Sequence, residues 1–134
     1  MNDRFYLMLL RLASLLGIIG VAFGAFGAHF LKSRLDEQSI EVVKTGVLYL
    51  FIHTITSLFI VLIGKNDTTS RYLKASGVFF IIGILLFSGS LFLIGTKSLT
   101  SWSIGYFGIL TPIGGLCFIL GWLMLLLYAL TRRT

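Results

Sequence analysis

The chain has 134 residues, of which 57% are hydrophobic and 12% are charged, with a net charge of +6 and a mean hydropathy of +0.98. Soluble domains carry about 25% charged residues, and a soluble fold of this length does not bury so much apolar surface. The composition excludes a soluble globule, a disordered chain, a collagen-like repeat and, because Cys117 is the single cysteine, a disulfide scaffold. The basic residues lie at the edges of apolar runs, which predicts contacts with lipid headgroups and not with nucleic acid.

Four apolar stretches are each about as long as a membrane-spanning helix, which needs about 20 residues. They cover residues 12–31, 46–64, 73–95 and 104–130. The first follows Arg4 and Arg11 and ends in small residues, as a signal peptide does, but we interpret it as a retained span. The sequence thus predicts an all-α membrane protein in which residues 1–134 form a single bundle of four transmembrane helices.

The segment between the first two spans has the pattern of a short helix. Ser33 and Asp36 resemble a helix start, and Glu37 would lie in a favourable first turn. An apolar stripe follows this start: Leu35, Ile40, Val43 and Val47. We therefore expect a short amphipathic helix at the membrane surface that runs into the second span.

The distribution of Lys and Arg predicts the orientation in the membrane. With four spans, both termini and the 65–74 loop share one side, which carries seven basic residues against four on the other side. The positive-inside rule then places both termini in the cytoplasm. We expect a multi-pass protein of the cell inner membrane in contact with the lipid bilayer.

The first span carries small residues along one face. Ala13, Gly17, Gly20, Gly24 and Gly27 follow one another at steps of four, three, four and three residues. Small residues let helix backbones approach closely in a membrane, so this face predicts tight helix packing. Its partner is either another helix of the chain or a second molecule, which would make the protein a homo-oligomer or part of a complex with another membrane protein.

Polar residues inside the spans suggest a second feature. They are His53 with Tyr49 and Thr56 on one face of the second span, Ser88 and Ser90 in the third, and Thr111 and Pro112 in the fourth. Pro112 has no N–H to donate and predicts a kink. Counted at about 1.5 Å per residue, these residues lie at a similar depth, which predicts a polar pocket around His53. His53 is either a neutral, structural histidine or a ligand or proton-carrying group.

A second histidine, His29, ends the first span. It either caps the last helical turn, reaches the membrane interface or lies above His53 as a second ligand or relay. Two histidines make an incomplete zinc site, and we expect no metal and no other cofactor. Motifs of nucleotide binding, metalloproteases and serine hydrolases are absent from the sequence, so we expect no enzyme activity.

Several of these residues form motifs similar to those of a known family. The motifs are Gly24-Ala-Phe-Gly-Ala-His29, Tyr49-x-x-x-His53, Ser88-Gly-Ser90, Thr111-Pro-Ile-Gly-Gly115 and Gly121-Trp122. Together they resemble the domain-of-unknown-function 423 family, small bacterial inner-membrane proteins related to the eukaryotic transmembrane protein 256, over about residues 17–127. Phe30 and Leu50 depart from the family's usual glycine and glutamine, and Leu50 removes a polar group from the predicted pocket. The resemblance implies the fold and the location but no activity.

Three classes of function are compatible with these features. The first is a non-enzymatic membrane protein that binds or organises lipids or partner membrane proteins through the glycine-rich face. The alternative is a minimal oligomeric channel or transporter for protons or small solutes that uses the polar layer around His53. A cofactor or metal site at His29 and His53 is the third class.

Overall fold

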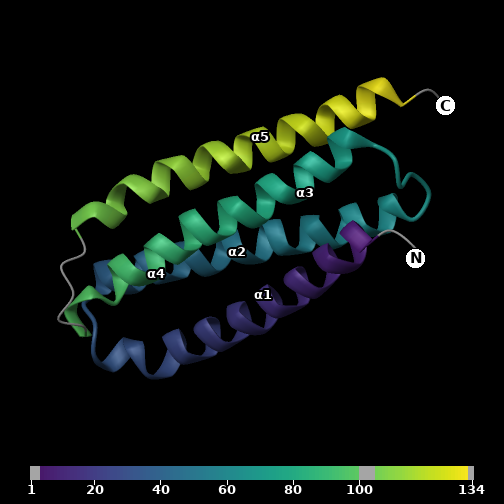
Figure 1. Cartoon of the computed structure of the whole chain (residues 1–134). Coiled ribbons are helices and arrows are strands. Elements are labelled where there is room, and N and C mark those ends of the chain that lie inside the picture. Colours follow the sequence, from purple (N-terminus) through teal and green to yellow (C-terminus); the bar gives the residue numbers. More distant parts are fainter. Residues whose placement is uncertain (1–3, 100–104, 133–134) are drawn as a thin grey trace.

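Four long helical stretches run side by side along the molecule (Figure 1). The computed structural model describes residues 4–99 and 105–132, without the side chains of residues 28, 105 and 106. The α-helices are α1 (Arg4–His29), α2 (Glu37–Gly64), α3 (Arg71–Gly83), α4 (Gly89–Gly95) and α5 (Leu110–Thr131). The remaining turns are the π-helical η2 (Ile84–Ser88) and the 3-10 helices η1 (Leu31–Ser33), η3 (Lys97–Leu99) and η4 (Gly105–Ile109). The prediction of an all-α membrane fold is confirmed, since four helical stretches are long and apolar enough to span a bilayer.

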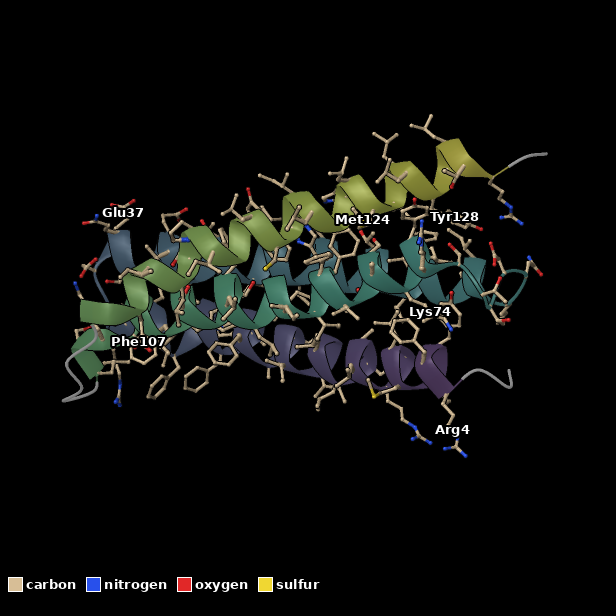
Figure 2. The ribbon with its side chains drawn as sticks, turned by 45° about the horizontal axis from the view of Figure 1, so that its top comes forward. Arg4, Glu37, Lys74, Phe107, Met124 and Tyr128 are labelled. Carbon is tan, nitrogen blue, oxygen red and sulfur yellow. The ribbon has the colours of Figure 1, made fainter. Side chains whose placement is uncertain are left out.

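The elements α3, η2 and α4 follow one another without a break and together make the third spanning stretch, Arg71–Gly95. Helix α1 packs on α2, and α5 packs on α3 and η2. Helices α1 and α5 therefore lie on opposite sides of the pair formed by α2 and the third spanning stretch (Figure 1). Both ends of the chain lie at one end of the bundle. Figure 2 shows Arg4, Lys74 and Tyr128 at that end, and Glu37 and Phe107 at the opposite end.

Helix α2 is longer than the sequence predicts, because it begins at Glu37 and continues to Gly64. Asp36 caps this start: its carboxylate accepts a hydrogen bond from the backbone N–H of Ser39 at 2.7 Å. This hydrogen bond lowers the pKa of the Asp36 carboxyl below its ordinary value.

The structure does not show the expected short amphipathic helix between the first two spans as an element of its own. Between His29 and Asp36 the structure has only the short 3-10 turn η1. Of the apolar stripe, Leu35 precedes α2, whereas Ile40, Val43 and Val47 belong to its N-terminal part. Leu35 and Val43 are buried against the rest of the bundle. No helix-breaking residue separates the part of the stripe within α2 from the span that follows.

Glycines bring the third and fourth spanning stretches into close contact. A Cβ atom at Gly114 would lie 2.4 Å from the backbone nitrogen of Phe87 in η2, and one at Gly121 would lie 2.6 Å from the ring of Phe80. The buried Ser76 hydroxyl donates to the carbonyl of Gly121 at 2.8 Å. Close backbone approach and hydrogen bonds between helices are the main sources of helix association in a bilayer, and α3 and α5 use both.

Pro112, where a kink was predicted, lies at the start of α5 and not in its interior. Helix α5 begins at Leu110, after the 3-10 turn η4, so Pro112 lies in its first turn. Backbone N–H groups in the first turn of an α-helix have no partner within that helix, so a proline is tolerated there. The sequence predicted a kink because the expected span began at residue 104, which lies outside the described residues, and so placed Pro112 within the helix.

Candidate functional site

His53 is buried in the middle of α2, with 3% of its surface exposed. Its Nδ1 lies 2.8 Å from the backbone carbonyl of Tyr49, and its Nε2 lies 3.3 Å from the indole nitrogen of Trp122. A carbonyl only accepts hydrogen bonds and an indole N–H only donates. His53 is therefore neutral, with its proton on Nδ1, and both ring nitrogens are used within the protein.

Aromatic rings hold the imidazole in place. The ring of Phe118 stacks on that of His53 with centroids 3.6 Å apart and planes 4° apart. Phe80 and Trp122 contact the imidazole at larger angles. From the sequence we did not single out Phe118, and we named Trp122 only in the Gly121-Trp122 motif of the family resemblance. The four-residue spacing of these two rings on α5 was the signal available.

Two other polar residues of the predicted pocket, Ser90 and Thr111, form a second, separate group. The Ser90 hydroxyl donates to the carbonyl of Phe87 at 2.9 Å and lies 2.7 Å from the hydroxyl of Thr111. Since Ser90 has one proton, Thr111 is the donor of the latter bond. On α5, Thr111 and Trp122 lie about 16 Å apart at 1.5 Å per residue. The structure thus places the Ser90 and His53 groups at two levels, whereas the sequence suggested one.

The other hydroxyls of α2 and the hydroxyl of Ser88 in η2 are bonded locally or have no partner. Thr56 donates to the carbonyl of Ile52, and Ser57 donates to that of His53, both at 2.8 Å. The hydroxyl oxygens of Thr54 and Ser88 are buried and have no hydrogen-bond partner among the described residues. From the sequence we did not name Thr54, which lies on a neighbouring face of α2, or Ser57, which lies one turn after His53 on the same face.

A groove of about 850 Å³ lies between the end of α1, the turn η1 and the first half of α2. Its apolar lining includes Phe23, Leu31, Leu35, Val43, Val47 and Phe51. Gly24 and Gly27 also line it, so half of the predicted glycine face borders this space. Leu48, which is 56% exposed, lies at its edge.

The four glycines of α1 have different surroundings. A Cβ atom at Gly20 would lie 2.7 Å from Leu50 and 3.0 Å from Phe51, so α2 of the same chain fills the space beside it. A Cβ atom at Gly24 would lie 3.7 Å from its nearest neighbour, and one at Gly27 would lie 3.9 Å away. Apart from the adjoining backbone of α1, no atom would lie within 4 Å of a Cβ atom at Gly17. Gly20 is therefore a packing residue, whereas the absence of side chains at Gly24 and Gly27 leaves the groove open.

Four charged residues border the groove at the end of the bundle away from the termini. Lys44 and Glu41 form a salt bridge with each other. Lys32, in η1, and Glu37, the first residue of α2, also line the groove and are exposed. Figure 2 shows Glu37 at this end of the molecule. The groove thus combines an apolar interior with a rim that carries both signs of charge.

His29 is the last residue of α1, and its side chain is exposed. The structure does not bring it to His53, which lies buried on another helix among aromatic rings. Within residues 4–99 and 105–132, no three His, Cys, Asp or Glu side chains are grouped as a metal site would require.

Comparisons with known proteins identify a matching family and several similar proteins. The family model described as "Protein of unknown function (DUF423)" matches residues 23–115. The UPF0382 inner membrane protein YgdD of Escherichia coli (strain K12) is 34% identical over 133 residues, 99% of this chain and 95% of the relative. A UPF0382 membrane protein of Haemophilus influenzae is 36% identical over 87% of this chain and 88% of its own length. The UPF0382 membrane protein SH2409 of Staphylococcus haemolyticus is 37% identical, with 87% and 89% covered. No solved structure matches the chain.

Proposed function

This chain belongs to the DUF423 family of membrane proteins, and we propose that it holds a lipid molecule in the groove between α1 and α2. The role is one of binding or organising lipid, without chemistry on the bound molecule. Neither the family description nor the names of the relatives indicate an enzyme activity.

The groove itself is the observation that carries this proposal. Ligand sites in proteins have volumes of about 300–1,000 Å³ and are mostly apolar with a few polar groups, and this groove has about 850 Å³ and such a lining. A helix face in a bilayer packs against either protein or lipid. Because Gly24 and Gly27 leave a hollow that no side chain of the described residues fills, an acyl chain is the natural occupant.

The channel alternative has less support from the described residues. A proton or solute path needs polar groups that follow one another across the membrane. Here His53 is bonded to Tyr49 and Trp122, and the Ser90 group lies elsewhere along the bundle. We therefore give His53 a structural role in our proposal.

We propose that both termini are cytoplasmic and that the groove lies in the outer leaflet. Support comes from the excess of Lys and Arg on the side of the termini, together with their position at one end of the bundle (Figure 1). Reporter fusions at the C-terminus test this: a cytoplasmic fluorescent reporter should be active and a periplasmic phosphatase reporter inactive.

We also retain the proposal that the protein is one bundle that assembles with further copies or with another membrane protein. Gly20 does not serve that contact, because Leu50 and Phe51 of the same chain occupy its surroundings. An oligomer would therefore not use the part of α1 around Gly20. Light scattering of the protein in a mild detergent measures the number of copies directly.

A matched pair of glycine variants tests lipid binding. Gly24→Leu places a side chain in the groove, whereas Gly17→Leu adds the same side chain to the same helix where no atom lies within 4 Å. We expect phospholipid retained per protein after detergent purification to fall in Gly24→Leu and to stay at the parent level in Gly17→Leu. Equal retention in all three proteins, with unchanged helix content, would contradict the proposal.

A further inference from the structure

We infer that the groove selects a phospholipid whose headgroup carries both a phosphodiester and a primary ammonium group. This inference rests on the proposed function, because it concerns the headgroup of the lipid whose chain would occupy the groove. The observation that carries it is the mixed charge of the rim beside an apolar interior.

The rim offers one cation and one carboxylate to a ligand. Lys44 and Glu41 neutralise each other in a salt bridge. Lys32 and Glu37 are exposed, and neither forms a salt bridge within the described part of the chain. Both lie at an end of the spanning helices, where lipid headgroups are found.

These two groups match the two charges of one headgroup. A lysine ammonium donates hydrogen bonds to phosphate oxygens, and a glutamate carboxylate accepts them from a primary ammonium. A quaternary ammonium has no proton to donate to Glu37. A purely anionic headgroup would satisfy Lys32 but would lie beside the carboxylate of Glu37, where like charges repel.

Competition between headgroups measures this selectivity. The parent protein is reconstituted with equal amounts of phosphatidylethanolamine, phosphatidylcholine and phosphatidylglycerol, purified in mild detergent, and its retained lipids are quantified by mass spectrometry. We expect phosphatidylethanolamine to be enriched about threefold over phosphatidylglycerol, the effect of one exposed ion pair, and phosphatidylcholine to lie between them.

Charge-neutralising variants assign the effect to the rim. Glu37→Gln should abolish the enrichment over phosphatidylglycerol, and Lys32→Gln should lower retention of every phospholipid. Lys65→Gln, which removes an exposed charge beyond the opposite end of α2, is the control and should behave as the parent.

The outcomes separate this inference from the proposed function. Equal retention of the three headgroups by the parent, or an unchanged preference in Glu37→Gln, overturns the headgroup inference; lipid binding in the groove survives if Gly24→Leu still lowers retention. If Gly24→Leu retains as much phospholipid as the parent, both the headgroup inference and lipid binding in the groove are overturned. A protein partner co-purifying in place of lipid, and lost in Gly24→Leu, would also overturn the headgroup inference.

Discussion

Trp122 on α5 donates its indole N–H to Nε2 of His53 on α2, across 3.3 Å. The opposite nitrogen of the imidazole donates to the Tyr49 carbonyl, and Phe118 stacks on the ring. One buried side chain thus links the second and fourth spanning helices through its face and through one edge. In this arrangement an intramembrane histidine acts as a packing and hydrogen-bonding residue.

Replacing His53 should lower stability in proportion to what is removed. His53→Ala leaves a cavity beside Phe118 and should cost about 2–3 kcal/mol. His53→Phe keeps an aromatic ring of similar size and loses only the hydrogen bonds, which are worth about 0.6 kcal/mol each in membrane proteins, so it should cost about 1 kcal/mol. Unfolding in mixed micelles at increasing denaturing detergent measures both. Two variants as stable as the parent would show that the imidazole does not hold the helices together.

The tautomer of His53 can be observed directly. The chain has two histidines, so nitrogen-15 spectra of labelled protein in micelles can be assigned by comparison with a His29→Gln variant. We expect the His53 ring to be neutral and to carry its proton on Nδ1, because a carbonyl faces that nitrogen and an indole N–H faces the other. A proton on Nε2 would rule out the Trp122 contact.

Two adjacent glycines of α5 should respond very differently to the same substitution. A Cβ atom at Gly114 would lie 2.4 Å from the backbone of Phe87, which cannot move as a flexible side chain does, whereas the nearest atom at Gly115 is 4.0 Å away. Gly114→Ala should cost at least about 2 kcal/mol, and Gly115→Ala should change stability by less than about 0.5 kcal/mol. The same micelle unfolding assay compares them, and similar losses in both would refute the close contact between η2 and α5.

The cap at Asp36 predicts a pH dependence of stability. Because the Ser39 N–H lowers the pKa of Asp36 in the folded protein, the ionised cap stabilises the fold above the unfolded-state pKa of about 3.9. This contribution is lost as the pH falls through the lower, folded pKa. Asp36→Asn keeps a capping side chain without the charge. The melting temperature of the parent relative to Asp36→Asn should therefore decrease on acidification below about pH 4; a constant or increasing difference would contradict the assignment.

The spanning helices could be read from the sequence because apolar length alone specifies them. Their ends could not. Polar first turns such as Glu37–Val43 continue the second span without any break in helix propensity, so the expected surface helix became part of α2. The kink at Pro112 was predicted because the start of the fourth spanning helix was also misplaced. The apolar sequence does not show that a 3-10 turn precedes α5, which begins at Leu110.

The residues of the candidate site were harder to place than the helices. The glycine spacing in α1 predicted one face that includes Gly20, Gly24 and Gly27. It could not show that Leu50 and Phe51 fill the space beside Gly20. Nor could it show that a groove lies beside Gly24 and Gly27. We expected His53 and Ser90 at equal depth because we counted residues from the expected ends of the spans. In the structure, α2 begins at Glu37 and α5 at Leu110 instead. Depth is a property of the helix register, which depends on contacts between distant residues.

Photo-crosslinking tests lipid binding in the groove most directly. Phosphatidylethanolamine with a photoreactive group in its acyl chain is incorporated into the protein, freely exchanging lipid is removed by detergent, and the crosslinked peptides are sequenced after irradiation. We expect adducts concentrated on the groove residues Phe23, Val47 and Phe51, and their loss in Gly24→Leu but not in Gly17→Leu. Adducts spread equally over exposed residues of α5 such as Ile119 and Leu123, and unchanged in Gly24→Leu, would contradict this expectation.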